Sequence, residues 1–328
     1  MKKSKCYEKS GKKTMIGGQA LIEGIYMRGP SRTATVVRKP DGTHIVREKE
    51  YKPAKKKCPV LGWPFIRGIF VFGGAIKDGV SELMFSANEC EIGEEGEPAK
   101  FDLWVEKKLG KERAEKLLMG FSVVVGVLMP IALFILLPAL LSSFVDFGGR
   151  LWLRNLVEGV LRMGIFLLFI FSTSRMKDMR RVYAFHGAEH KTIHCYESGE
   201  ELTVENVRRH TRKHPRCGTS FLFVVMLISI IFFSFVRTEI WFPGVTAKWA
   251  VTLLRLASRL VLLPVVLNIS YEFNRIVGRY DNFLTVALRW PGVAMQSMTT
   301  NEPDDEMISV AIDAIKRVIP ENGEDDKW

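Results

Sequence analysis

The sequence has few cysteines, and their spacing suggests no disulfide framework. The five are Cys6, Cys58, Cys90, Cys195 and Cys217. An odd number of widely scattered cysteines, in a chain of 328 residues that can bury a large core, excludes the class of small disulfide-stapled proteins. We therefore predict reduced thiols, and we expect Cys195 and Cys217 to be buried thiols rather than nucleophiles.

The chain also lacks an apolar segment directly after its basic start. MKKSKCYEKSGKKT continues into GGQALIEG, whereas a signal peptide would continue with roughly 7 to 15 apolar residues, so we infer no cleaved signal. Hydrophobic residues make up 47% of the chain and charged residues 25%. The two kinds are segregated, because charge is dense at 1–14 and 175–216 and sparse at 119–145, 160–173, 219–236 and 256–271. This segregation is typical of a membrane protein.

Four stretches are long and apolar enough to predict transmembrane helices. Residues 119–145 form a run of 27 residues without a charged side chain, enough to cross a hydrocarbon core of roughly 30 Å. The other predicted spans are 151–174, 219–236 and about 256–274. Residues 247–259 place Lys and Arg among apolar side chains, which favours a separate helix lying in the membrane interface.

Charge asymmetry predicts the orientation, because cytoplasmic segments carry an excess of Lys and Arg. Ten of these residues lie between Arg175 and Arg216, and seven lie before Gly29, against Arg150 and Arg154 in the short link between the first two spans. Both termini and the loop at 175–218 are therefore expected in the cytoplasm.

The predicted fold class is a mainly α membrane protein with about four transmembrane helices, an interfacial or re-entrant helix at 59–86, and a small N-terminal β-hairpin on the cytosolic side. The hairpin is predicted from TATVVRKPDGTHIVREKEY, and a helix is predicted in the tail from SVAIDAIKRVI. The expected divisions are 1–58, 59–118 with an acidic linker and an amphipathic lead-in, 119–174, 175–218, 219–274 and 275–328.

Five of the six histidines fall within 29 residues: His186, His190, His194, His210 and His214. In a helix over this segment, the first three are four residues apart and share one face, where two of them can hold one metal ion. Together with Glu189, His186 and His190 also form H-x-x-E-H, in which two histidines bind zinc and the glutamate activates water.

A catalytic zinc site needs a third protein ligand and an open position for water. The candidates for that ligand are His194, His210, His214 and Cys217. The simpler alternatives are a structural metal site, or histidines that pair with carboxylates without any metal. The Arg and Lys residues at 208–216 could attract phosphate or anionic headgroups, or they could be topology signals alone.

Two further places could belong to such a site. GGQALIEGIYMRGP surrounds Glu23 and Arg28 with glycines, which lets the backbone approach a ligand closely, although it could also be a plain loop. After the fourth span, polar groups return to the predicted cytosolic face: Glu272, Thr299, Thr300 and Glu302. The alternative there is helix capping by Thr300 or Asn301 ahead of the tail helix.

These segments make the chain similar to a bacterial family of multi-span proteins labelled YqhQ-like, which has no assigned function and is described as predicted metal-dependent enzymes. The resemblance covers nearly the whole chain and is carried by GGQALIEGIYMRGP at 17–30, FHGAEHKTIHCYE at 185–197, HPRCGTSF at 214–221, YEF at 271–273 and QSMTTNEP at 296–303. It implies a metal-dependent activity and a bacterial cytoplasmic membrane, but no substrate. It also suggests that the glycine-rich start and the TTNEP segment join the histidines in one site.

The resulting hypothesis is a zinc-dependent hydrolase of the membrane surface, with Glu189 as its catalytic base and a membrane peptide or lipid-linked molecule as its substrate. The alternative is a non-enzymatic scaffold that binds a membrane protein or lipid headgroups and in which a metal or polar network only fixes the loop. A transporter is disfavoured, because Glu158 and Arg162 are the main ionisable groups at mid-depth. No nucleic-acid partner is predicted.

Overall fold

The structure is a computed structural model that describes residues 13–53, 58–90, 107–108, 110–236, 241–242, 244–245, 247–320 and 326. Contacts divide the chain into two compact units: one holds 1–90, 170–228 and 263–328, and the other holds 91–169 and 229–262. The predicted acidic linker after Cys90 lies outside the described residues. Of the amphipathic lead-in, the structure describes 107–108 and 110–118, which are helical except at Gly110.

The first unit contains a four-stranded antiparallel sheet in the order β1-β2-β3-β4. Its strands are β1 Gly17–Leu21, β2 Gly24–Arg28, β3 Arg32–Arg38 and β4 His44–Glu50. The predicted hairpin is confirmed as β3 and β4, which pair through Val36 and Val46. The turn between them uses Gly42 with a φ of 83°, a conformation that glycine adopts without steric cost.

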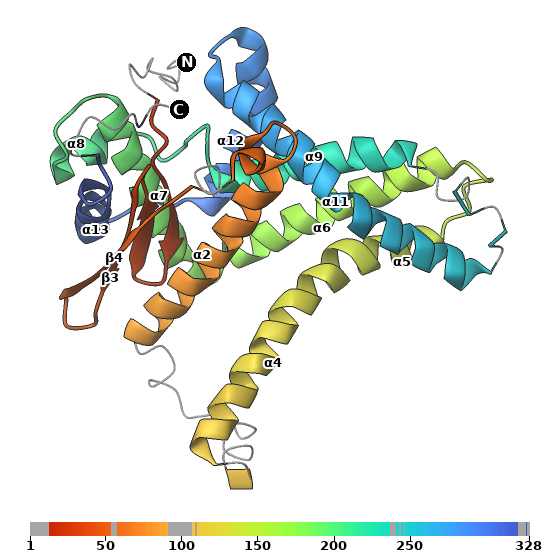
Figure 1. Cartoon of the computed structure of the whole chain (residues 1–328), viewed down its shortest axis with the longest axis horizontal. Helices are drawn as coiled ribbons and strands as arrows, with labels where there is room; N and C mark the ends of the chain where they lie inside the picture. The colour runs from red at the N-terminus through yellow and green to blue at the C-terminus, as the bar shows by residue number, and fades with distance from the viewer. Residues whose placement is uncertain are drawn as a thin grey trace. The chain divides into compact units, whose positions relative to one another are not determined.

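Helices cover both faces of this sheet (Figure 1). α7 Lys177–Glu197 and α13 Asp305–Lys316 contact the face on which Ala34 and Val36 are buried. On the other face Thr35 donates a hydrogen bond of 2.7 Å to Glu82 of α2 Arg67–Glu89. Alternate residues of β3 therefore serve two different layers, as the period of a strand requires.

The main hydrophobic core lies between the sheet, α7 and α13. Phe185 of α7 is fully buried, as are Ile308 and Ile315 of α13 and Ile25 of β2. The predicted tail helix is thus confirmed as α13, but it is a core element. Its N-cap is Asp304, whose side chain accepts a hydrogen bond from the Met307 N–H, so the alternative of capping by Thr300 or Asn301 is wrong.

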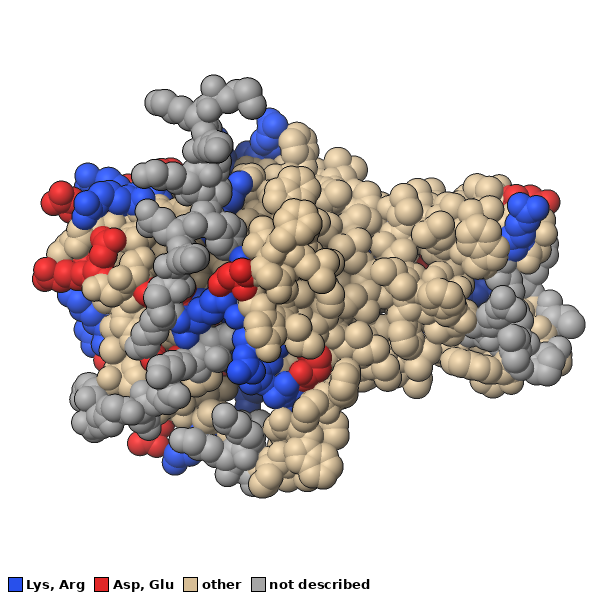
Figure 2. Space-filling view, turned by 90° about the horizontal axis from the view of Figure 1, so that it is seen from above, with Lys and Arg blue, Asp and Glu red and all other residues tan. Residues whose placement is uncertain are grey.

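Four helical segments are long and apolar enough to cross a membrane, as predicted, and the chain is a multi-pass membrane protein. They are Val124–Ser143, Trp152–Thr173, Gly218–Phe235 and Trp249–Arg279. The first runs through α4 Lys111–Ile131, the π-helical segment η2 Ala132–Leu136 and α5 Leu137–Ser143, and the others belong to α6 Leu151–Thr173, α9 Gly218–Phe235 and α11 Lys248–Arg279. Figure 2 shows a broad surface without Lys, Arg, Asp or Glu, as lipid contact requires.

One segment differs from the sequence-based expectation. Residues 248–259 do not form a separate helix, because they are the first part of α11, which runs unbroken through Pro264. The predicted interfacial segment consists of η1 Pro59–Gly62 followed by α2. The remaining helices of the first unit are the short α8 Val204–Arg209 and α12 Phe283–Thr299, of which α12 was not predicted.

The second unit buries a charged cluster between its helices. Glu158, which is 1% exposed, pairs with Arg162 at 3.2 Å as predicted, and also with Arg259 of α11 at 3.1 Å. Arg162 donates a further hydrogen bond of 2.7 Å to the Phe134 carbonyl in η2. A π-helical turn leaves carbonyls without their usual helical partners, which explains why this one can accept from a side chain.

Candidate metal site

The histidines of α7 lie on one face, as their spacing of four residues predicts. The ring centroids of His186 and His190 are 4.4 Å apart. His214, from the loop before α9, lies alongside the same face, with its centroid 5.6 Å from that of His190 and 4.8 Å from that of His194. The α7 face and this loop therefore meet within the first unit.

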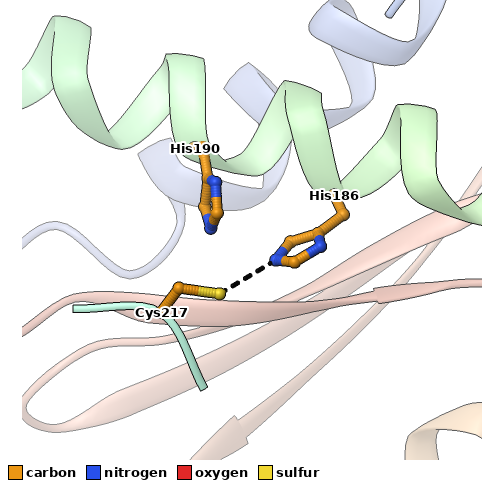
Figure 3. Close-up of side chains that lie close together, drawn as sticks. All are labelled: His186, His190 and Cys217. Atoms are coloured by element: carbon orange, nitrogen blue, oxygen red, sulfur yellow. Dashed lines mark hydrogen bonds between the residues drawn. The ribbon is translucent and has the colours of Figure 1, made fainter. Parts of the chain in front are cut away.

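The first group of ligand-type atoms combines His186 and His190 with Cys217 (Figure 3). His186 Nε2 is 3.2 Å from Cys217 Sγ, and one ligand atom from each of the three residues lies within 4.8 Å of the others. Bonds of about 2.0 Å to nitrogen and 2.3 Å to sulfur in a tetrahedral zinc site place ligand atoms at comparable separations. Of the four predicted third ligands, Cys217 is the one that joins His186 and His190.

Backbone carbonyls hold both rings by their other nitrogen. His186 Nδ1 is 2.8 Å from the Thr299 carbonyl, and His190 Nδ1 is 2.6 Å from the Arg212 carbonyl. A carbonyl can only accept, so each Nδ1 must carry the proton that it donates. In neutral rings this leaves the Nε2 lone pairs free, which is the tautomer and orientation found in metal-binding histidines.

Glu189 lies beside this group at the sheet. Its side chain is buried, and its Oε1 accepts a hydrogen bond of 3.0 Å from the Gly18 N–H in β1. A Cβ at position 18 would stand 2.5 Å from the Tyr26 carbonyl oxygen and 3.2 Å from the Glu189 carboxyl carbon, so only glycine fits. The glycine-rich start thus reaches the site through Gly18, a residue that the sequence did not single out.

Burial and neighbouring charge perturb these groups. Burial alone would raise the pKa of the Cys217 thiol, but the imidazoles of His186 and His190 bring it well below its usual range. Burial alone would lower the pKa of His186, but the Cys217 thiolate raises it to about 9. Burial raises the pKa of Glu189, although both histidines oppose this effect. Without a metal, the site therefore favours a thiolate facing an imidazolium.

A second group of ligand-type atoms consists of His194, Glu197 and His214. It differs from the first because a cation already pairs with its carboxylate: Arg216 forms an ion pair with Glu197, which also accepts a 2.7 Å hydrogen bond from the Thr14 N–H. Burial lowers the pKa of His194 to about 4 and holds that of His214 well below its usual range. These histidines form a neutral packing network. Glu197 was not predicted, although it lies three residues after His194 on the same helical face.

A third group, Cys195 with Glu200 and His210, lies at the turn between α7 and α8. Burial raises the pKa of Cys195 to about 11, which keeps the thiol protonated. The Cys195 thiol points to the Glu201 carbonyl at 3.6 Å. A protonated thiol is a poor metal ligand, so this group is weaker than the one at Cys217.

Other predicted site residues have separate partners. Glu23 pairs with Arg38 and Arg181. Burial alone would raise the pKa of Glu23, but these two guanidinium groups bring it below its usual value. The remaining placements are Arg28 over the Tyr51 ring, Glu272 with Arg67, and Glu302 with Lys191. The ion pair between Glu302 and Lys191 is close to the histidines, because Lys191 directly follows His190 in the sequence.

Residues at the C-terminal end of α12 form hydrogen bonds with His214 and His186. Gln296 is fully buried; its Oε1 accepts from the His214 N–H at 2.7 Å, and its Nε2 donates to the His214 carbonyl at 2.7 Å. Thr299 supplies the carbonyl behind His186, and the Thr300 hydroxyl donates to the Gln296 carbonyl. The Thr299 hydroxyl is buried and has no hydrogen-bond partner among the described residues. Thr299 and Thr300 thus join the site through backbone and helix-end contacts.

Residues 63–321 match the model of a family described as "Protein of unknown function (DUF1385)". This match covers most of the chain, including α7, the loop with Cys217 and α12. The chain belongs to the DUF1385 family. It is 30% identical over 308 residues to the "Uncharacterized protein YqhQ" of Bacillus subtilis (strain 168), with 92% of each chain covered. The predicted resemblance to YqhQ-like proteins is therefore confirmed. No solved structure matches the chain.

Proposed function

We propose that the chain is a metal-dependent hydrolase of the membrane surface, with His186, His190 and Cys217 as metal ligands and Glu189 as the general base. The observation that supports this most is the backing of both imidazoles by the Thr299 and Arg212 carbonyls. It turns two Nε2 lone pairs toward the same sulfur, which a random cluster of buried histidines would not do. The donor set of two nitrogens and one thiolate suits zinc.

A zinc ion with three protein ligands keeps one position for water and lowers the pKa of that water to about 7. Glu189 is the group that would take the proton from this water. The Gly18 N–H fixes one of its oxygens at 3.0 Å and so limits the directions in which the other can point. Burial favours the protonated acid, and a divalent cation nearby would restore the carboxylate. The proposed substrates are membrane peptides or lipid-linked molecules.

The rival function is a scaffold in which the same groups only hold α7 to the loop before α9. The thiolate–imidazolium contact between Cys217 and His186 favours this rival, since it satisfies both groups without a metal. In that case the polar network would be structural, and the protein would bind a partner or lipid headgroups.

Elemental analysis of the purified full-length protein tests the metal site on which the proposed hydrolase depends. We expect about one zinc per chain in the wild type and its loss in His186→Ala, His190→Ala and Cys217→Ser. His44→Ala is the matched control, because His44 is the one histidine outside the cluster and lies in β4. A wild type without stoichiometric metal, or equal loss in His44→Ala, would overturn the metal site and leave the scaffold.

A further inference from the structure

The exposed surface of α12 is apolar, whereas its buried face holds its single charged residue. Arg289 is 6% exposed and pairs with Asp281 at 2.7 Å. Among the exposed side chains, Phe283 is 90%, Trp290 67% and Leu284 64% accessible. A helix on the surface of a water-soluble protein shows the opposite pattern, with apolar residues inside and charges outside. Water is therefore a poor solvent for this helix.

The position of α12 in the chain connects it to the transmembrane helices. It begins at Phe283, four residues after the candidate span ends at Arg279. It also packs closely on the start of α9, because a Cβ on Gly292 would stand 3.0 Å from the Ser220 Cβ. The apolar surface of α12 thus continues from the ends of two helices that cross the bilayer.

A second helix, α2, meets the same two spans and exposes apolar side chains as well as the charged Lys77. A Cβ on Gly68 of α2 would stand 2.8 Å from the Tyr271 Cβ of α11, and the Phe72 ring lies 5.9 Å from the Phe221 ring of α9. Just before α2, Trp63 and Phe65 are 57% and 63% exposed. Aromatic side chains of this kind gather at the interface between headgroups and acyl chains.

We propose that α12 lies in the bilayer interface, at the leaflet where α9 begins and α11 ends, with Phe283, Leu284 and Trp290 among the phospholipid acyl chains. The continuity of this surface with α9 and α11 supports lipid as its occupant. Lys13 is neutralised beside the first turn of α12 by Asp281 at 2.7 Å, but Arg279, at the end of α11, is exposed and adds positive charge there. Anionic headgroups attract such charge, whereas a protein partner would need matching acidic groups.

The consequence concerns the histidines. Gln296 and Thr299, which hold His214 and His186, lie at the opposite end of α12 from Phe283. Gln296 is six residues after Trp290, which is a rise of about 9 Å along the helix. A helix seated in lipid would therefore carry part of the support of the histidine cluster, whether or not a metal is bound there.

Site-specific photocrosslinking tests the proposal in the full-length protein. A benzophenone amino acid replaces Leu284, and the protein is reconstituted in vesicles of phosphatidylethanolamine and phosphatidylglycerol. Val261 of α11, which is 75% exposed in a candidate span, serves as the lipid-facing control. Glu50 of β4, whose side chain is 82% exposed, serves as the water-facing control.

We expect a lipid adduct at position 284, detected by mass spectrometry, with a yield within about threefold of that at 261 and at least tenfold above that at 50. A crosslinked dimer at 284 would assign the surface to a second copy, and a yield like that at 50 would assign it to water. Either result overturns the proposal. A second variant at Trp290 covers the case in which substitution at 284 disturbs the fold. The readout is independent of metal and activity, so its failure is distinct from that of the proposed hydrolase.

Discussion

Glu189 has an environment that suits a base more than an ion-pair partner. Its hydrogen bond comes from the Gly18 backbone, and in the described contacts no Lys or Arg side chain pairs with it. The carboxylates nearby on α7 and after α12 differ, because Glu197 pairs with Arg216 and Glu302 pairs with Lys191. A carboxylate without a permanent cation can respond to a metal or to a substrate proton.

We expect Glu189→Gln to keep the fold and the bound zinc but to lower hydrolysis by at least 100-fold, since general base catalysis contributes about 10² to 10⁴ in rate. The amide can still accept the Gly18 hydrogen bond but cannot take a proton. Turnover of a panel of membrane peptides and phospholipids in detergent micelles, measured beside metal content, checks this. Glu302→Gln is the control with an expected change below about threefold. Equal activity of Glu189→Gln and wild type would exclude the base.

Gly187 sets the distance between α7 and the chain after α12. A Cβ at this position would stand 2.1 Å from the Asn301 carbonyl oxygen, so the backbone itself would have to move. We expect Gly187→Ala to lower the free energy of unfolding by about 1–3 kcal/mol, the usual cost of overpacking. Thermal unfolding in detergent measures it. Gly164→Ala in α6 is the control, because nothing lies within 4 Å of its Cβ position, and we expect no loss there.

Sequence spacing predicted the histidine face of α7 but left the third ligand open. His186, His190 and His194 share a helix, so a period of 3.6 residues places them. Cys217 belongs to a loop that the chain reaches only after α8, and its contact with His186 depends on the path of that loop. The same holds for Gly18 and the Thr299 carbonyl, whose contacts join segments far apart in the sequence.

At the scale of elements, α6 and α11 are joined by a buried charge cluster. Among the residues that the structure describes, Glu158 of α6 is the carboxylate that pairs with both Arg162 and Arg259. Removing it would leave two guanidinium groups in an apolar setting without their counter-charge. The packing of α6 against α11 should therefore depend strongly on Glu158, because the free-energy cost of an uncompensated buried charge is large.

We expect Glu158→Gln to destabilise the protein by about 3–5 kcal/mol, the range for breaking a buried ion pair from one side. Unfolding in mixed micelles as a function of SDS concentration measures this loss. Glu48→Gln is the comparison, since Glu48 forms an ion pair with Arg317 at the surface and should cost about 0–1 kcal/mol. A similar small effect at both positions would mean that the cluster does not hold the helices.

The elements that sequence predicted best are those decided by length and period. Runs such as 119–145 can cross a bilayer whatever their neighbours, so four spans followed from composition. α12 escaped prediction because its charged residue is buried and its apolar residues are exposed, the reverse of the assumed pattern. β1 and β2 escaped because GGQALIEG reads as a glycine-rich loop, although Gly18 and Gly24 fit close backbone contacts.

At the scale of the whole molecule, contacts restrict the topology without reference to charge. Gly18 contacts Glu189, and Thr299 contacts His186, so these three chain segments lie on one side of the membrane. Two candidate spans lie between Gly18 and His186, and two lie between Cys217 and Thr299. Even numbers of spans agree with contact on a single side. That this side is the cytoplasm remains the prediction from Lys and Arg.

Reporter fusions test the orientation. We expect a green fluorescent protein fused after residue 328 to fluoresce and alkaline phosphatase at the same place to be inactive, since the first folds only in the cytoplasm and the second only outside it. Phosphatase inserted at Gly148, in the link between α5 and α6, should instead be active. Reversed signals at both places would place the histidines outside and contradict the charge-based orientation.

The hydrogen bond from His186 to the Thr299 carbonyl also determines when, during synthesis, the histidine cluster can be completed. This carbonyl belongs to Thr299, which leaves the ribosome after the last candidate span has been made. A nascent chain that stops at α11 already has His186, His190 and Cys217 but lacks the Thr299 acceptor that orients one imidazole and the Gln296 side chain that holds His214. Maturation of this cluster is thus a late event in biogenesis, and a chain whose last span failed to insert would be left with an incomplete cluster that quality-control proteases could recognise.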